Sequence, residues 1–132
     1  MKFALLLYGD ESVWADMSPE ELQQSVEVWN AFGQQLIDAG ALVTGEALAP
    51  TSEATTVRLT EGELVRTDGP FAETREQLGG YYRLDCKDLD EAIGWAARIP
   101  DAATGCVEVR PVMNYEALGA EHPDQTREAS ER

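Results

Sequence analysis

Hydrophobic residues change from strand spacing to helical spacing along the first third of the chain. Residues 3–8 are apolar at both sets of alternating positions, which is typical of a central strand covered on both faces. Ser18-Pro19-Glu20-Glu21 has the composition of a helix start, and apolar residues at helical spacing follow it. We therefore predict a helix over residues 19–39, ended by Gly40, with Trp29 in its apolar stripe, and a strand at residues 41–48.

The second part of the chain begins with a predicted hairpin. Two strand-like runs, residues 55–60 and 63–67, flank Glu61-Gly62, a pair that suits a two-residue turn. We expect this hairpin to project from the domain as an insertion. A loop then leads to a strand at residues 81–86, and Asp88 with Glu91 has the spacing of a capping box before a second helix that Pro100 ends. The last strand is predicted at residues 106–112 from its alternation.

This order, β-α-β-(hairpin)-β-α-β, predicts an α+β fold of the ferredoxin-like type, with both helices on one face of an antiparallel sheet. The other face would then leave leucines of the first strand in water, at about 1.5–3 kcal/mol per large side chain. A second copy of the chain is the simplest cover, so we predict a homodimer. The domain should span residues 1–115, and residues 116–132 read as a polar, flexible C-terminal tail.

Charge and cysteine content narrow the classes of partner and cofactor. The formal net charge of −15 argues against binding nucleic acid. The apolar run at residues 3–8 is too short for a membrane span or a signal peptide, so we expect a cytoplasmic protein. Cys86 and Cys106 lack zinc-ligand spacing and should lie at opposite ends of the sheet as buried, reduced thiols. No nucleotide-binding glycine motif occurs, and we expect no metal and no cofactor.

Alternation along the predicted strands sends polar side chains to the open face of the sheet. We expect this face to hold a cluster of acids, a tyrosine and arginines, with an acid and an arginine from the preceding loop at its rim: Glu46, Tyr81, Arg83, Glu108 and Arg110, then Asp68 and Arg75. The cluster could bind a small molecule or form a polar dimer interface through arginine–carboxylate pairs. Asp68 could be a turn former or a carboxylate at a pocket edge, and Trp14 could cap that pocket.

Residues 68–82 give the chain its most specific signature. Asp68-Gly69-Pro70-Phe71, Glu73-Thr74-Arg75-Glu76-Gln77 and Gly79-Gly80-Tyr81-Tyr82 closely resemble the DGPF-type branch of the YCII-related family. The resemblance implies a dimeric α/β barrel in which two sheets face each other. Enzymatic relatives are associated with a histidine–aspartate pair, whereas the one histidine of this chain, His122, lies in the predicted tail. That pair is therefore not carried over.

Two functions follow from these observations. The first is a dimeric small-molecule-binding protein, with or without lyase- or isomerase-like activity on a small anionic or phenolic compound. A base would come from Asp68, Glu46 or Glu108, and an anion would be held by Arg75, Arg83 or Arg110. The second is a non-catalytic accessory or regulatory protein, because the resemblance implies association with an extracytoplasmic-function sigma factor. Whether the chain is an enzyme stays open at this point.

Overall fold

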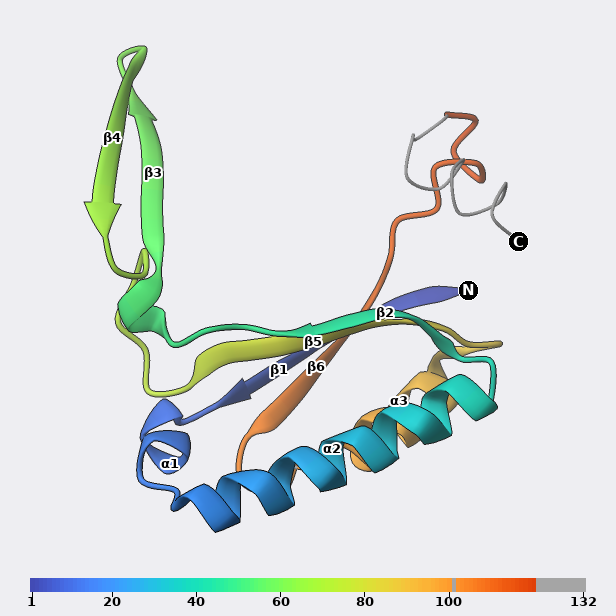
Figure 1. Cartoon of the computed structure of the whole chain (residues 1–132). Helices are drawn as coiled ribbons and strands as arrows, with labels where there is room; N and C mark the ends of the chain where they lie inside the picture. Colours follow the sequence, from blue (N-terminus) through green and yellow to red (C-terminus); the bar gives the residue numbers. More distant parts are fainter. Residues whose placement is uncertain (101, 121–132) are drawn as a thin grey trace.

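The computed structural model describes residues 1–100 and 102–120, and it shows a four-stranded antiparallel sheet with the helices on one side (Figure 1). The elements, in chain order, are β1 (Lys2–Gly9), α1 (Glu11–Ala15), α2 (Pro19–Asp38), β2 (Leu42–Ala47), the 3-10 turn η1 (Thr51–Glu53), β3 (Thr55–Thr60), β4 (Glu63–Asp68), β5 (Gln77–Asp85), α3 (Leu89–Ala97) and β6 (Cys106–Pro111). This arrangement confirms the predicted α+β class and is consistent with a ferredoxin-like fold.

The first strand lies inside the sheet, as its doubly apolar sequence predicted. The strand order is β2-β5-β1-β6, and β1 is antiparallel to both of its neighbours. Cys86 follows the end of β5 that pairs with Lys2, whereas Cys106 pairs with Tyr8 at the other end of β1. The two thiols are free, as expected, but only Cys86 is buried and Cys106 is exposed.

The hydrophobic core lies between the sheet and the helices. Phe3, Leu5 and Leu84 come from the sheet and are almost fully buried, and the helices cover them with residues such as Phe32, Leu36 and Trp95. The predicted stripe of α2 is only partly correct. Trp29 is only partly buried, and the outer stripe positions Leu22, Val26 and Ile37 are exposed because the sheet packs against a narrower strip of α2.

Both long helices begin where their capping residues predicted. The Ser18 hydroxyl accepts a hydrogen bond from the Glu21 backbone N–H at 3.1 Å, and the Asp88 carboxylate accepts one from the Glu91 N–H at 2.9 Å. The Glu91 carboxylate accepts from the Lys87 N–H at 2.7 Å, one residue earlier than an ideal capping box. These contacts satisfy backbone donors that the first helical turn leaves without partners.

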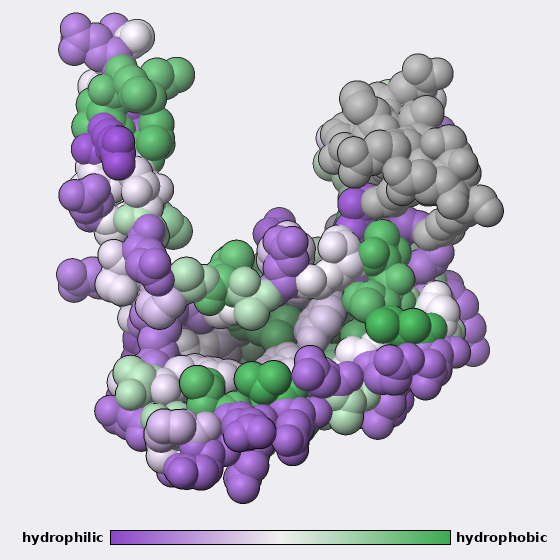
Figure 2. Space-filling model, in the orientation of Figure 1, coloured by the Kyte–Doolittle hydropathy of each residue, from purple (hydrophilic) through white to green (hydrophobic). Residues whose placement is uncertain are grey.

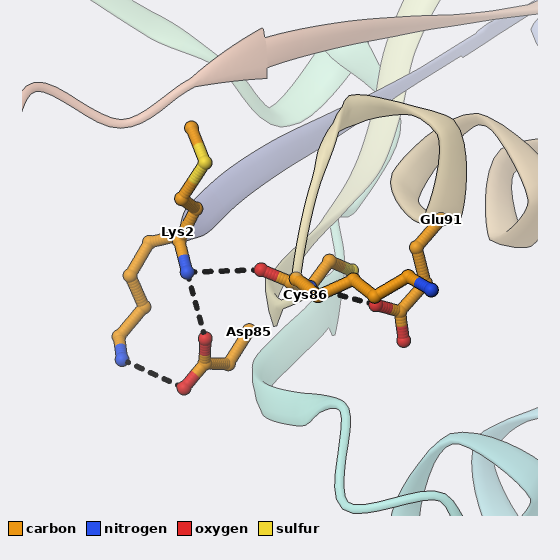
Figure 3. Close-up of polar contacts among 6 residues, drawn as sticks. Lys2, Asp85, Cys86 and Glu91 are labelled. Atoms are coloured by element: carbon orange, nitrogen blue, oxygen red, sulfur yellow. Dashed lines mark hydrogen bonds and ion pairs between the residues drawn. The ribbon is translucent and has the colours of Figure 1, made fainter.

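One end of the sheet is closed by polar contacts around Asp85 (Figure 3). The Asp85 carboxylate accepts from the Met1 nitrogen at 3.3 Å and pairs with the Lys2 ammonium at 3.4 Å. The Met1 nitrogen also donates to the Cys86 carbonyl at 2.9 Å. Burial, followed by the nearby Glu91 and Asp85 carboxylates, raises the pKa of the Cys86 thiol, so this cysteine is a poor nucleophile.

The predicted hairpin is confirmed, and it forms a separate two-stranded sheet of β3 and β4. Glu61 and Gly62 both have positive φ angles, 51° and 81°, as a two-residue turn of this kind requires. Figure 1 shows that this hairpin, residues 55–68, projects from the body on the side of the sheet away from the helices. We refer to it as the arm.

The loop after the arm is shorter than predicted, because β5 begins at Gln77 rather than Tyr81. The pairing skips Gly79 between Leu7 and Tyr8, so Gly79 forms a β-bulge. At Gly80 a Cβ atom would lie 2.9 Å from the Glu46 carbonyl oxygen, so the backbones approach closely there. The two glycines therefore lie within β5, where Gly79 forms the bulge and Gly80 allows the close approach of β2.

Two short elements were not predicted. α1 occupies the segment around Trp14 that we expected to be a loop, and the Asp10 carboxylate caps it by accepting from the Ser12 N–H and hydroxyl at 2.9 and 2.7 Å. The other is η1. Of the predicted tail only residues 116–120 are described, and His122 lies outside the described residues. None of the helices in residues 1–100 and 102–120 is long and apolar enough to cross a membrane.

Candidate functional site

A pocket of about 620 Å³ lies between α2 and the sheet. Figure 2 shows the surface hollowed between the helices and the sheet above them. One wall is formed by residues of α2, including Trp29, Gly33 and Ile37, and the opposite wall by residues of the sheet, including Leu7, Gly45 and Tyr82. The exposed stripe positions Val26 and Ile37 thus face a space that the sheet does not fill.

Aromatic rings form the most ordered part of this pocket. The Tyr82 ring stacks near Trp29, with centroids 6.5 Å apart and planes 20° from parallel, and it meets Phe32 edge-on at 5.7 Å. Burial raises the pKa of the Tyr82 hydroxyl. The Trp29 indole nitrogen is buried and has no hydrogen-bond acceptor among the described residues. Because this nitrogen is buried, it does not open onto the pocket, and it is the ring of Trp29 that contributes to the wall.

The rim of the pocket carries little charge. Trp14 of α1 lines it, and so does the exposed Cys106. Among the described residues that line the pocket, Glu46 is the one with a formally charged side chain, and its carboxylate accepts from Tyr81 on the open face. The amides of Asn30 and Gln34 add neutral hydrogen-bonding groups. The pocket is therefore largely apolar and holds no arginine, lysine or histidine to attract an anion.

The open face of the sheet carries the polar residues that the sequence placed there. Strand pairing aligns them in two rows across the four strands. The first row is Glu46, Tyr81, Leu6 and Glu108, and the second is Thr44, Arg83, Ala4 and Arg110. Five of the seven predicted site residues, all except Asp68 and Arg75, thus share one face.

Side-chain contacts connect residues on this face, among them the Lys2–Asp85 ion pair at 3.4 Å. The Tyr81 hydroxyl donates to the Glu46 carboxylate at 3.0 Å, and this hydrogen bond, with the negative charge of Glu46, raises the pKa of Tyr81. The Arg110 guanidinium lies 4.0 Å from the Glu108 carboxylate, and both groups are well exposed. An exposed pair at that distance contributes little to stability. The open face is thus polar, and contacts between side chains of neighbouring strands connect it.

Asp68 and Arg75 lie away from these rows. Asp68 ends β4, is exposed, and pairs with Thr55 at the base of the arm. Next to it, the Gly69 N–H donates to the Ala54 carbonyl at 2.7 Å, and the Gly69 φ of 105° suits glycine alone. Hydrogen bonds from Ser12 lower the pKa of Asp10, and the charge of Arg75 lowers it further, which places Arg75 near that carboxylate. The geometry favours the turn interpretation of Asp68, and a binding role for either residue stays a prediction.

No separate sequence signal marks the α2 side of the pocket. Trp29 lies in the apolar stripe of a helix, where a core position is the ordinary interpretation. Asn30 and Gln34 look like solvent-facing residues of the same helix. What distinguishes them is the separation of α2 from β2 and β5, and that separation depends on tertiary packing.

Comparison with known proteins places this geometry in a family. A family model described as the YCII-related domain matches residues 1–116. An uncharacterized protein of Rhizobium meliloti (strain 1021) is 43% identical over 117 residues, which is 87% of this chain and 94% of that protein. The match covers the whole sheet, both long helices, the arm and the pocket. The chain therefore belongs to the YCII-related family.

Proposed function

We propose that this protein binds an uncharged, planar organic molecule in the pocket between α2 and the sheet. The observation that carries the proposal is the pocket itself: its volume of about 620 Å³ falls in the usual range for ligand sites, about 300–1,000 Å³. Its walls are largely aromatic and aliphatic, and the side-chain amides of Asn30 and Gln34 can hydrogen-bond to a neutral ligand. A ring of aromatic size with one carbonyl or hydroxyl oxygen matches this lining.

The charge of the lining decides between a neutral and an anionic ligand. None of the described residues that line the pocket is basic, and the arginines expected to hold an anion, Arg83 and Arg110, belong to the open-face rows instead. An anion in a largely apolar pocket without a counter-charge would lose its hydration without compensation. The proposal therefore keeps the phenolic class of ligand and sets the anionic class aside.

We also propose that the protein is a homodimer whose open faces meet, as the resemblance to the DGPF-type branch and its dimeric barrels implies. Leu6 lies in the middle of a polar row, partly buried in the single chain. A second sheet would cover it and bring the arginines of one chain near the acids of the other. Arginine and glutamate at such a face pair well across an interface, which suits the interface interpretation of Arg83, Glu108 and Arg110.

The proposed role is binding rather than turnover. Lyase- or isomerase-like chemistry needs a proton donor and acceptor whose pKa values lie near the working pH. Tyr81 is held further from that range by Glu46, and Tyr82 by burial. Cys106 lines the pocket, but it has no histidine among the described lining residues to activate it.

Acetophenone and benzoate make a matched pair of probes, since both are planar and of similar size but only benzoate is charged. We expect acetophenone and neutral phenols to raise the melting temperature and benzoate to leave it unchanged. Calorimetric titration of Trp29→Ala, which removes an aromatic wall of the pocket, should show up to about tenfold weaker binding. Arg110→Ala is the control on the open face and should bind as the wild type does.

Two results would contradict this proposal. Stabilisation by benzoate that disappears in Arg110→Ala would move the site to the open face and restore an anionic ligand. Stabilisation by none of the probes, together with capture of a sigma factor by the purified protein, would favour the accessory role instead.

A further inference from the structure

The arm has little packing against the rest of its own chain. All of its residues except Thr56 are exposed, and it contributes none of the buried core. Its contacts with the body are concentrated at its base, where Thr56 donates to the Gly69 carbonyl at 2.8 Å. An isolated two-stranded hairpin is at best marginally stable in water, so an arm of this length gains stability only by packing on something else.

One face of the arm is suited to such packing. Leu59 lies directly opposite Leu64, and Val57 lies opposite Arg66, so alternation and pairing place these four side chains together. Val57, Leu59 and Leu64 are 55%, 75% and 66% exposed. We call this set the clasp face. Figure 2 shows hydrophobic side chains gathered on the arm well above the sheet. The opposite face carries mostly threonine and charged residues, including Arg58 and Glu63.

We infer that the clasp face packs against a second copy of this chain. The inference rests on the homodimer proposed above and goes beyond it by assigning the arm to the interface. The arm rises on the side of the sheet that the helices leave uncovered (Figure 1), so a partner seated on the open face would lie beside it. The contact between the two sheets would then extend directly onto the arm.

The size of the open face supports this occupant. The two rows across the sheet supply eight side chains, four in each. A stable protein interface uses about 20–30 residues on each side. When the arm of each chain packs on the other chain, both arms add to the contact area. The interface then comes closer to the size that a stable dimer needs.

Charge does not select the occupant of the clasp face. With a net charge of −15, two chains repel each other, and the first 54 residues contain one base, Lys2, against nine acids. The arm carries Arg58 and Arg66 but also Glu61, Glu63 and Asp68, so its own net charge is −1. The support for a second copy therefore comes from the apolar residues of the clasp face and from the position of the arm.

Sedimentation equilibrium over a range of micromolar concentrations tests the clasp. Leu59→Asp with Leu64→Asp should weaken dimerisation by at least about tenfold, because it places charge in an apolar contact. Thr60→Asp with Thr67→Asp adds the same charge on the opposite face of the arm and is the matched control. We expect the control to dimerise within about twofold of the wild type, a difference well under 1 kcal/mol.

Deletion of the arm provides a second test that does not depend on correct folding of the aspartate variants. Ala54 and Gly69 are already joined by a backbone hydrogen bond, so a Gly-Gly link can replace residues 55–68. This deletion should keep the circular dichroism of the body and the binding of acetophenone, and lose dimer affinity. If the deletion dimerises as tightly as the wild type, the clasp is wrong while the dimer stands. If the wild type itself is a monomer, the dimer and the clasp fail together, and the pocket is judged separately by its ligands.

Discussion

Leu5 and Leu6 are neighbours in β1, yet Leu5 is fully buried under the helices and Leu6 lies in a row with Glu46, Tyr81 and Glu108 on the open face. The same contrast runs through the sheet. One face carries Phe3, Leu5 and Leu84 and supplies the core and a wall of the pocket, and the other carries acids and arginines. Two chemically different surfaces thus share one set of strands.

The contrast separates stability from recognition. On the helix-covered face, the core residues act through packing, because the helices fill the space around them everywhere except at the pocket. On the open face, a residue has few contacts within its own chain, so its effect depends on what covers that face. Substitutions at adjacent positions should therefore change different measured quantities: the unfolding free energy on one face, and the dimer affinity or pH dependence on the other.

The largest expected difference lies between Leu5→Ala and Leu6→Ala. Leu5→Ala removes a side chain of 0% exposure and should lower the unfolding free energy by about 2–5 kcal/mol at any protein concentration. Leu6→Ala should cost less at low concentration, and its effect should grow with concentration as the dimer forms. Urea denaturation at two protein concentrations measures both. Equal losses for the two variants, without concentration dependence, would remove the distinction between the faces.

A smaller difference is expected between two glycines. A Cβ atom at Gly45 would overlap the Tyr82 ring, whereas a Cβ atom at Gly79 would meet nothing within 4 Å. Gly45→Ala should therefore shift the ring that stacks near Trp29, at a cost of about 1–3 kcal/mol. It should also weaken ligand binding in the pocket. Gly79→Ala, in the exposed bulge, is the control for stability and should be nearly neutral there. Because Gly79 also lines the pocket, it is not a control for ligand binding. A pocket that tolerates Gly45→Ala would not be shaped by Tyr82.

Much of the fold could be read from local sequence signals. Ser18 and Asp88 fix helix starts through their own side chains, and Glu61-Gly62 fixes the hairpin turn through its backbone. Alternation along each strand was sufficient to place Glu46, Tyr81, Arg83, Glu108 and Arg110 on a single face. Each of these signals depends on neighbours within a few residues, so it can be recognised without knowledge of the tertiary structure.

The pocket could not be predicted in the same way. Its volume arises because only a narrow strip of α2, at Phe32 and Leu36, packs fully against the sheet, and no local pattern encodes the separation of two elements. Trp29 therefore looked like an ordinary core residue. The start of β5 was missed for a related reason: Gly79 and Gly80 resemble a loop in sequence, but pairing with β1 and β2 holds them in the strand.

The subtlest difference between the faces concerns two adjacent tyrosines whose pKa values are raised by different causes. Glu46 raises the pKa of Tyr81 through a hydrogen bond and its charge, whereas burial raises that of Tyr82. A raised pKa means that the contribution to stability is complete below the unfolded-state value, about pH 10, and is lost as pH rises through the folded-state value. Glu46→Gln should lower the pKa of Tyr81 toward its ordinary value and leave the pKa of Tyr82 unchanged. Phenolate absorbance at increasing pH measures both. Tyr81→Phe and Tyr82→Phe identify the two transitions. If Glu46→Gln lowers both pKa values, one electrostatic field acts on both tyrosines, and the two faces are not electrostatically separate.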